Sequence, residues 1–376
     1  MVALAPPAEV PRWVTHALVP AANLIVAFVI AGIIIALIGE DPFLALRLLV
    51  LGAFGNLEFI GFTLYFTTNF IFTGLAVAVA FHCMLFNIGG EGQAYIGGLG
   101  VGLVGLMLGG WPTLIVIVLG ILASILFGAA WAVIPAYLQA KRGSHIVITT
   151  IMFNFIAASV MTYLLVEILI EPGQQAPRSR EFETNAWLPF MHEACGWFGI
   201  VIEKSSLNLS FLLAIAASFV VWVLIWHTRW GYEIRTVGAN PTAAVYAGIS
   251  PARNIILAMV ISGALAGMVG INEVMGVHHR LILDFTAGFG FVGIAVALMG
   301  RNHPLGIFFA ALLFGALYQG GAELSFDMPT VTRDMVVVIQ GLVILFSGAM
   351  EHVFRPHIVA AYMRLRGYAG APASAE

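Results

Sequence analysis

Long stretches without a charged residue constrain the fold of this chain more than any other feature. Residues 92–140 form a run of 49 without Asp, Glu, Lys or Arg. A membrane-spanning helix needs about 20 apolar residues, so this run is long enough for two, and the Gly-Gly-Trp-Pro sequence at 109–112 predicts the turn between them. The runs are continuous, which favours helices over a β-barrel. Only 9% of the residues are charged, against about 25% in soluble domains, so we predict an integral membrane protein.

Other uncharged runs bring the prediction to about ten spanning helices in one domain covering 1–376. The run 17–38 exceeds the core of a signal peptide, about 7–15 residues, so we expect it to be a retained first span. The expected fold is therefore an all-α polytopic membrane protein. The remaining predicted spans are 59–81, 143–166, 205–228, 254–272 and 302–322, with two shorter ones at 285–300 and 335–350.

The distribution of basic residues predicts the orientation. With the N-terminus inside, ten of the 16 Lys and Arg residues lie on the cytoplasmic side, as the positive-inside rule favours. Both termini are then cytoplasmic, with a tail at 351–376, a long outer loop at 171–204 and a long inner loop at 228–253.

The net charge of −3 and the absence of a basic cluster argue against nucleic-acid binding. Cys83 and Cys195 fall on different segments, where we expect ordinary thiols.

Two glycine-rich interruptions suggest an inverted repeat of spans two to five and seven to ten. Residues 86–93 and 286–291 each fall between the first two spans of a set. Paired interruptions in corresponding places are typical of a transport pathway. The alternative is that the glycines only allow close packing of helices.

The first interruption contains the polar residues Asn87, Glu91 and Gln93 in an apolar setting. A carboxylate in hydrocarbon costs a few kcal/mol unless it is paired or hydrated, so these residues are candidates for a substrate pathway. The alternative is a structural bracket in which Glu91 caps the N-terminus of the next helix. The sequence leaves both interpretations open.

The inner loop contains a second motif at 231–249. Asn240 is a good helix cap, Pro241 suits a first helical position, and Gly248 can end a short helix over 242–247 in a left-handed conformation. Such a helix across the cytoplasmic face is suited to transmit movement from a partner, although an ordinary loop helix is the alternative. We expect a plain turn at His303.

No pattern for covalent or metal chemistry is present in the sequence. There is no Gly-rich phosphate loop, no nucleophile triad and no zinc-hydrolase motif, and the adjacent His278 and His279 do not share a helix face. We therefore expect no catalytic residue, no metal site and no cofactor in this chain. Any ATP would be hydrolysed on a separate subunit.

The motifs at 86–93, 231–249 and 288–304 resemble those of permease subunits of bacterial importers powered by ATP-binding cassettes. The resemblance is to the branched-chain amino acid and simple-sugar group, nucleoside type, and covers about 44–354. It implies a bacterial inner membrane and three partners: a cytoplasmic ATPase, a second permease (self or paralogue) and an extracytoplasmic substrate-binding protein. It also implies ATPase coupling through Arg235, Gly238, Asn240, Pro241, Ala244 and Gly248.

For the substrate, we expect nucleosides, with simple sugars and then branched-chain amino acids as alternatives. Phe86, Phe289 and Phe291 are placed to offer stacking faces to a base, while Asn87 and Gln93 offer hydrogen bonds. An ion-driven secondary transporter is the alternative from another class. It would titrate Glu91, Glu167 or Glu273.

Overall fold

The computed structural model describes residues 19–348, and within them the regular structure is helical. The predicted tail at 351–376 lies outside the described residues. So do residues 17–18 of the first predicted span and 349–350 of the last. Contacts divide the chain into two compact units. The larger is Val50–Gly320, and the smaller contains the described residues 19–49 and 321–348.

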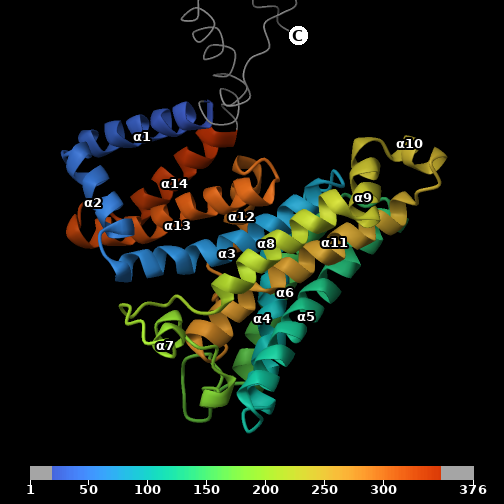
Figure 1. Cartoon of the computed structure of the whole chain (residues 1–376), viewed down its shortest axis with the longest axis horizontal. Helices are drawn as coiled ribbons and strands as arrows, with labels where there is room; N and C mark the ends of the chain where they lie inside the picture. The colour runs from blue at the N-terminus through green and yellow to red at the C-terminus, as the bar shows by residue number, and fades with distance from the viewer. Residues whose placement is uncertain (1–18, 349–376) are drawn as a thin grey trace, which may run out of the picture. The chain divides into compact units, whose positions relative to one another are not determined.

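The helices follow the uncharged runs closely (Figure 1). Six helices, including joined π-helical turns, are long and apolar enough to cross a membrane, and four shorter apolar helices accompany them. In chain order the helices are α1 (Val19–Leu37), α2 (Pro42–Phe54), α3 (Leu57–Phe81), α4 (Gly90–Met107), α5 (Thr113–Arg142), α6 (Ile146–Tyr163) with the π-helix η2 (Leu164–Ile168), the 3₁₀ turn η3 (Thr184–Ala186), α7 (Met191–Gly196), α8 (Ser210–His227), α9 (Arg229–Ala239), α10 (Pro241–Tyr246), α11 (Pro251–Gly267), the π-helix η4 (Ile271–His278), α12 (Phe289–Met299), α13 (Pro304–Asp327) and α14 (Arg333–Gly348).

Three elements differ from the sequence-based expectation. Helix α2 was not predicted, because Arg47 interrupts its apolar run. Helix α9 occupies much of the expected inner loop and is amphipathic rather than apolar. Helix α12 has 11 residues, about 16 Å at 1.5 Å per residue, too short to cross a hydrocarbon layer of about 30 Å. The predicted span at 285–300 is therefore partly a non-helical connection.

Small residues bring α4, α5 and α11 into close contact in the larger unit. A Cβ atom added to Gly97 would lie 2.4 Å from Cα of Gly267, and one added to Gly128 would lie 2.3 Å from the carbonyl oxygen of Gly263. Ser124 Oγ also donates to the carbonyl oxygen of Gly267 at 2.6 Å. Helices in membranes pack through such close backbone contacts, so some of the glycines serve packing, as the alternative interpretation held.

The larger unit has two ends that matter for function. Figure 1 shows α9 and α10 at one end of the bundle formed by α3, α4, α5, α6, α8 and α11, and α7 at the opposite end. We call these the α10 end and the α7 end. Helix α5 finishes at the α10 end with Lys141 and Arg142 in its last turn and Gly143 in a left-handed cap. Basic residues there complement the negative end of the helix dipole.

The smaller unit has its own apolar core. Ala31 and Ile35 of α1, Ala45 of α2, and Val336 and Ile339 of α14 form its centre. Thr330 donates a hydrogen bond to Glu40 within the same unit.

Candidate functional site

The two glycine-rich interruptions meet at the N-termini of α4 and α12. A Cβ atom added to Gly290 would lie 2.2 Å from the backbone nitrogen of Glu91. Helix α4 has 18 residues, about 27 Å, and α12 is about 16 Å long, so each is shorter than a hydrocarbon layer of about 30 Å. The contact lies where these two short helices begin, and we therefore call them half-helices. Half-helix N-termini within a membrane are typical of transport pathways.

Glu91 fills this contact, which we call the Glu91 joint. Its Oε1 accepts hydrogen bonds from Thr286 Oγ1 at 2.5 Å and from the amide of Gly288 at 2.9 Å. Its Oε2 accepts from the amide of Gly290 at 2.8 Å. Glu91 lies in the first turn of α4, the next helix, and its carboxylate also caps α12 from the other half of the chain. The charge offsets the positive ends of both helix dipoles.

The N-terminus of α4 has a separate cap that sequence reasoning missed. Asn154 of α6 accepts from the amide of Gly92 at 2.9 Å and donates to the carbonyl oxygen of Ile88 at 2.9 Å. The available signal was the single Asn in the uncharged run 143–166.

Asn87 and Gln93 lie together, buried, behind the Glu91 joint. Asn87 Nδ2 donates to Gln93 Oε1 at 2.9 Å and to Ser262 Oγ of α11 at 2.8 Å, while its Oδ1 accepts from the amide of Gly89. Ser262 donates in turn to the carbonyl oxygen of Ala76 on α3. These amides tie the interruption to α3 and α11. Their contact with a substrate stays a prediction.

The three predicted aromatic residues have different surroundings. Phe289 is buried, and its ring lies 5.5 Å from that of Phe70 in an edge-on contact. Phe86 packs against Phe81 at 6.3 Å and is half-buried. Phe291 is 48% exposed. The structure therefore brings Phe289 to the joint itself and leaves Phe86 and Phe291 at its margins.

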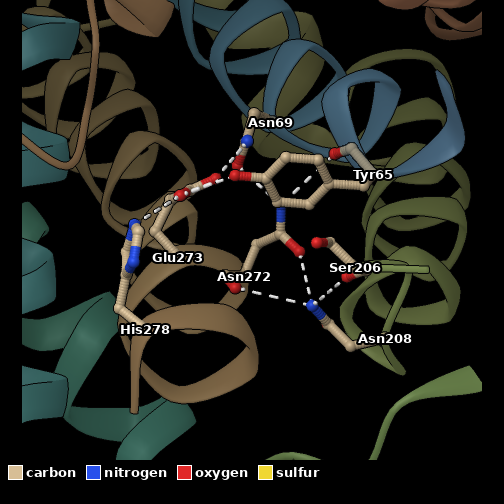
Figure 2. Close-up of polar contacts among 7 residues, drawn as sticks. All are labelled: Tyr65, Asn69, Ser206, Asn208, Asn272, Glu273 and His278. Atoms are coloured by element: carbon tan, nitrogen blue, oxygen red, sulfur yellow. Dashed lines mark hydrogen bonds and ion pairs between the residues drawn. The ribbon is translucent and has the colours of Figure 1, made fainter. Parts of the chain in front are cut away.

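A second polar cluster, centred on Glu273 of η4, lies between α3 and η4 (Figure 2). Glu273 is 1% exposed. Its Oε2 accepts from Tyr65 Oη at 2.8 Å and lies 3.5 Å from His278 Nε2, and its Oε1 accepts from Asn69 Nδ2 at 2.5 Å. Glu273 had been singled out only as a titratable carboxylate. The surrounding donors show how the fold accommodates it inside the bundle.

The neighbouring Asn272 extends this cluster to α8, and we call the whole set the Glu273 network. Asn272 Nδ2 donates to Asn69 Oδ1 at 2.9 Å, and its Oδ1 accepts from Asn208 Nδ2 at 2.9 Å and from Ser210 Oγ at 2.8 Å. Figure 2 shows Asn208 reaching Asn272 from the segment before α8. The network thus joins α3, η4 and the start of α8. π-Helical segments within α-helices often lie at functional sites, and η4, with eight residues, is a long one.

The other predicted titratable positions lie apart from both clusters. His279 points away from His278 and stacks on Trp187 at 4.0 Å, and burial lowers the pKa of His279. Glu167 is exposed on η2. His303 lies in the turn before α13, as predicted, where its Nδ1 accepts from the amide of Leu305.

The predicted helix at the α10 end is present. Asn240 Oδ1 accepts from the amides of Thr242 and Ala243 at 3.0 Å each, Pro241 opens α10, and Gly248 has φ +75° after it. The helix ends at Tyr246, one residue before the expected end. Tyr246 is 90% exposed, so α10 offers an apolar and aromatic face to a partner.

Helices α9 and α10 are fixed to the bundle at one end of the interruption. Ala244 of α10 is buried in a cluster that also contains Ala80, Cys83 and Leu85, at the end of α3 and the start of the interruption. A Cβ atom added to Gly238 would lie 2.2 Å from the carbonyl oxygen of His82. Leu85 lies two residues before Asn87, so this cluster connects α10 to the start of the interruption.

One charged side chain of α9, Glu233, ties it to Asn254 of α11. Glu233 is buried and accepts from Arg229 Nε at 2.9 Å and from Asn254 Nδ2 at 3.3 Å, which lowers the pKa of Glu233. Arg235 is half-buried on the same helix, with its Nε lacking a hydrogen-bond partner among the described residues.

Comparison with known proteins agrees with this arrangement. The chain is 33% identical over 345 residues to the guanosine ABC transporter permease protein NupP of Bacillus subtilis, covering 91% of this chain and 97% of the relative. It is 34% identical over 339 residues to the nucleoside ABC transporter permease protein NupB of Lactococcus lactis, covering 88% and 90%. It is 31% identical over 363 residues to the glucose ABC transporter permease protein TsgB13 of Haloferax volcanii, covering 96% and 94%.

No solved structure matches the chain. A family match covers residues 59–348, which include both interruptions and α10. With its apolar helices and its two opposed half-helices, the chain belongs to the family described as the permease component of the branched-chain amino acid transport system.

Proposed function

We propose that this chain forms part of the membrane pathway of an importer that takes up nucleosides. The observation that carries the proposal is the Glu91 joint, where two half-helices begin and a single carboxylate holds both. Opening such a contact creates a polar passage, and closing it restores a seal. The names of two relatives at 33% and 34% identity support nucleosides as the class of substrate.

The energy comes from a separate ATPase in this proposal. The chain has no phosphate-binding loop, so nucleotide must bind elsewhere. The exposed face of α10 is the docking site, which makes the α10 end cytoplasmic and puts the segment 169–209 outside a bacterial inner membrane. A second permease subunit, identical or paralogous, completes the pathway, and an extracytoplasmic binding protein delivers the substrate to the α7 end.

The contacts suggest how movement reaches the pathway. ATP binding draws the ATPase domains together and displaces α10. The cluster around Ala244 and Leu85 carries that displacement to Asn87, whose side chain is bonded to Ser262 of α11. The interruption then shifts relative to α12 and weakens the bonds that Glu91 makes. The Glu273 network meanwhile holds α3, α8 and η4 together.

A sugar importer is the second candidate. It is favoured by the similarity to a glucose permease over 96% of this chain. Nothing in the Glu91 joint itself distinguishes a sugar from a nucleoside, because a carboxylate accepts hydrogen bonds from both.

Uptake by the whole complex tests the proposal. The permease would be reconstituted in vesicles with its ATPase and second permease, and the uptake of labelled guanosine, adenosine and uridine measured with added binding protein. We expect uptake that requires ATP and is reduced by unlabelled nucleosides but not by ribose or glucose. Uptake that needs only an ion gradient would contradict the ATP-driven mechanism, and uptake of glucose alone would replace the substrate.

A further inference from the structure

We infer that Phe66 and Tyr318, together with Glu91, form a subsite that receives the flat ring of a nucleobase. This inference rests on the proposed function and adds residues that neither the motifs nor the relatives identify. Both side chains come from long helices, Phe66 from α3 and Tyr318 from α13, rather than from the interruptions.

The two rings stand beside the Glu91 joint. Their centroids are 5.6 Å apart, and each lies 6.3 Å from the ring of Phe289, whose neighbours Gly288 and Gly290 hold the Glu91 carboxylate. Phe70 backs the group at 5.0 Å from Tyr318. Tyr318 is also near enough to Glu91 for the two to interact electrostatically.

The side chains of this group differ in how much of their surface is exposed. Phe70 and Phe289 are buried, whereas Phe66, Tyr318 and Glu91 each keep part of their surface exposed. Phe66 is the tenth residue of the 25 in α3, which places it near the middle of that helix. A carboxylate exposed to lipid at such a depth is costly. The exposed side therefore faces the pathway rather than hydrocarbon.

The chemistry of this face fits a heteroaromatic ring better than a sugar. Bases stack on aromatic side chains with little dependence on their identity. A carboxylate has about four lone-pair positions, of which three are used by Thr286, Gly288 and Gly290. The position left on Oε2 accepts from an N–H group at the edge of a base. A free sugar offers hydroxyl groups but neither a π face nor an N–H edge.

The test is kinetic and uses the reconstituted complex. With Phe66→Leu and Tyr318→Leu, we expect the KM for nucleoside uptake to rise about tenfold, as the loss of one stacking contact predicts, with ATP turnover unchanged. Tyr318→Phe keeps the ring, and its KM should stay within about twofold of the original. Phe155→Leu is the matched control, because Phe155 is an exposed aromatic residue on α6 and lies outside the ring group of Phe66, Phe70, Phe289 and Tyr318.

Three results would overturn the inference. An unchanged KM in both leucine variants would remove the subsite but leave nucleoside import intact. A rise that is equal in Tyr318→Phe and Tyr318→Leu would point to the hydroxyl group instead of the ring. Absence of nucleoside uptake by the unaltered complex would overturn the proposed function and this inference together. If a leucine variant does not assemble, Phe66→Met and Tyr318→Met fill similar space with a flexible chain and carry the same expectation.

Discussion

The bundle contains two carboxylates that are held in opposite ways. Glu91 is bound by backbone amides of Gly288 and Gly290 and keeps part of its surface exposed. Glu273 is fully enclosed and bound by the side chains of Tyr65 and Asn69, with His278 nearby. The first joins two chain interruptions, and the second joins continuous helices.

This difference indicates which carboxylate moves. A bond between Glu91 and the start of α12 breaks when the two half-helices separate, and because Glu91 is already partly exposed, water can replace the lost donors. Releasing Glu273 would leave several buried polar groups without partners, each at a cost of about 1–3 kcal/mol. We therefore assign movement to the Glu91 joint and rigidity to the Glu273 network.

Gly290→Ala should have the largest effect, because the added methyl group pushes the starts of α4 and α12 apart. The added Cβ would lie 2.2 Å from the backbone nitrogen of Glu91, where no side chain can yield. We expect transport to be lost and the unfolding free energy to fall by about 3 kcal/mol or more. Uptake and thermal unfolding in detergent would measure both. Gly110→Ala is the control, since its Cβ would meet nothing within 4 Å. Normal uptake by Gly290→Ala would mean that the joint is not formed during transport.

Glu273→Ala tests rigidity in the other region. It leaves Tyr65 Oη and Asn69 Nδ2 without an acceptor, so we expect a loss of about 2–6 kcal/mol in stability. Glu273→Gln keeps one acceptor oxygen and should lose less than half as much. The midpoint of thermal unfolding is the measurement. If Glu273→Ala were as stable as the original chain but inactive in uptake, Glu273 would belong to the moving part.

Much of the fold could be predicted from sequence because lipid requires long apolar helices. The turn at 109–112 follows from glycine and proline, and α3 ends at Phe81, where the predicted span 59–81 ends. Helix α2 could not be found in this way because Arg47 breaks its run. The span predicted at 285–300 overlaps the interruption at 286–291, and its helix begins only at Phe289 because an uncharged run does not show where a helix starts.

The candidate site was predictable in its residues but not in its partners. Asn87, Glu91 and Gln93 stood out as polar groups in an apolar run. Their hydrogen bonds to Ser262, Thr286 and Gly288 join positions about 175 to 197 residues apart, and local pattern contains no information on such pairs. Asn240 is the opposite case, because a cap bonds within three residues of its own position.

Glu91→Gln should reduce transport with a smaller loss of stability than Glu273→Ala. An amide offers one acceptor oxygen in place of two, so either Gly290 or the pair Thr286 and Gly288 loses its partner. One lost bond of about 1–2 kcal/mol corresponds to a change of about tenfold in the equilibrium between closed and open joints. We expect a similar fall in uptake, with folded protein still obtained. Glu167→Gln, on the exposed surface of η2, is the control. Loss of all folded protein would make Glu91 a structural bracket only.

Asn240→Ala should have the smallest effect of the four substitutions. It tests whether movement of α10 is transmitted to the Glu91 joint. The change removes the cap of α10, which leaves the amides of Thr242 and Ala243 to water at a cost of about 1 kcal/mol in a local helix. The global unfolding midpoint should not move, because α10 lies outside both polar clusters. Uptake per ATP hydrolysed should fall about two- to fivefold as α10 frays. Asn240→Asp keeps an acceptor at the cap and should restore the ratio. If Asn240→Ala left the ratio unchanged while Glu91→Gln lowered it, the path from Ala244 through Leu85 to the joint would be disproved, and coupling would have to enter the bundle elsewhere.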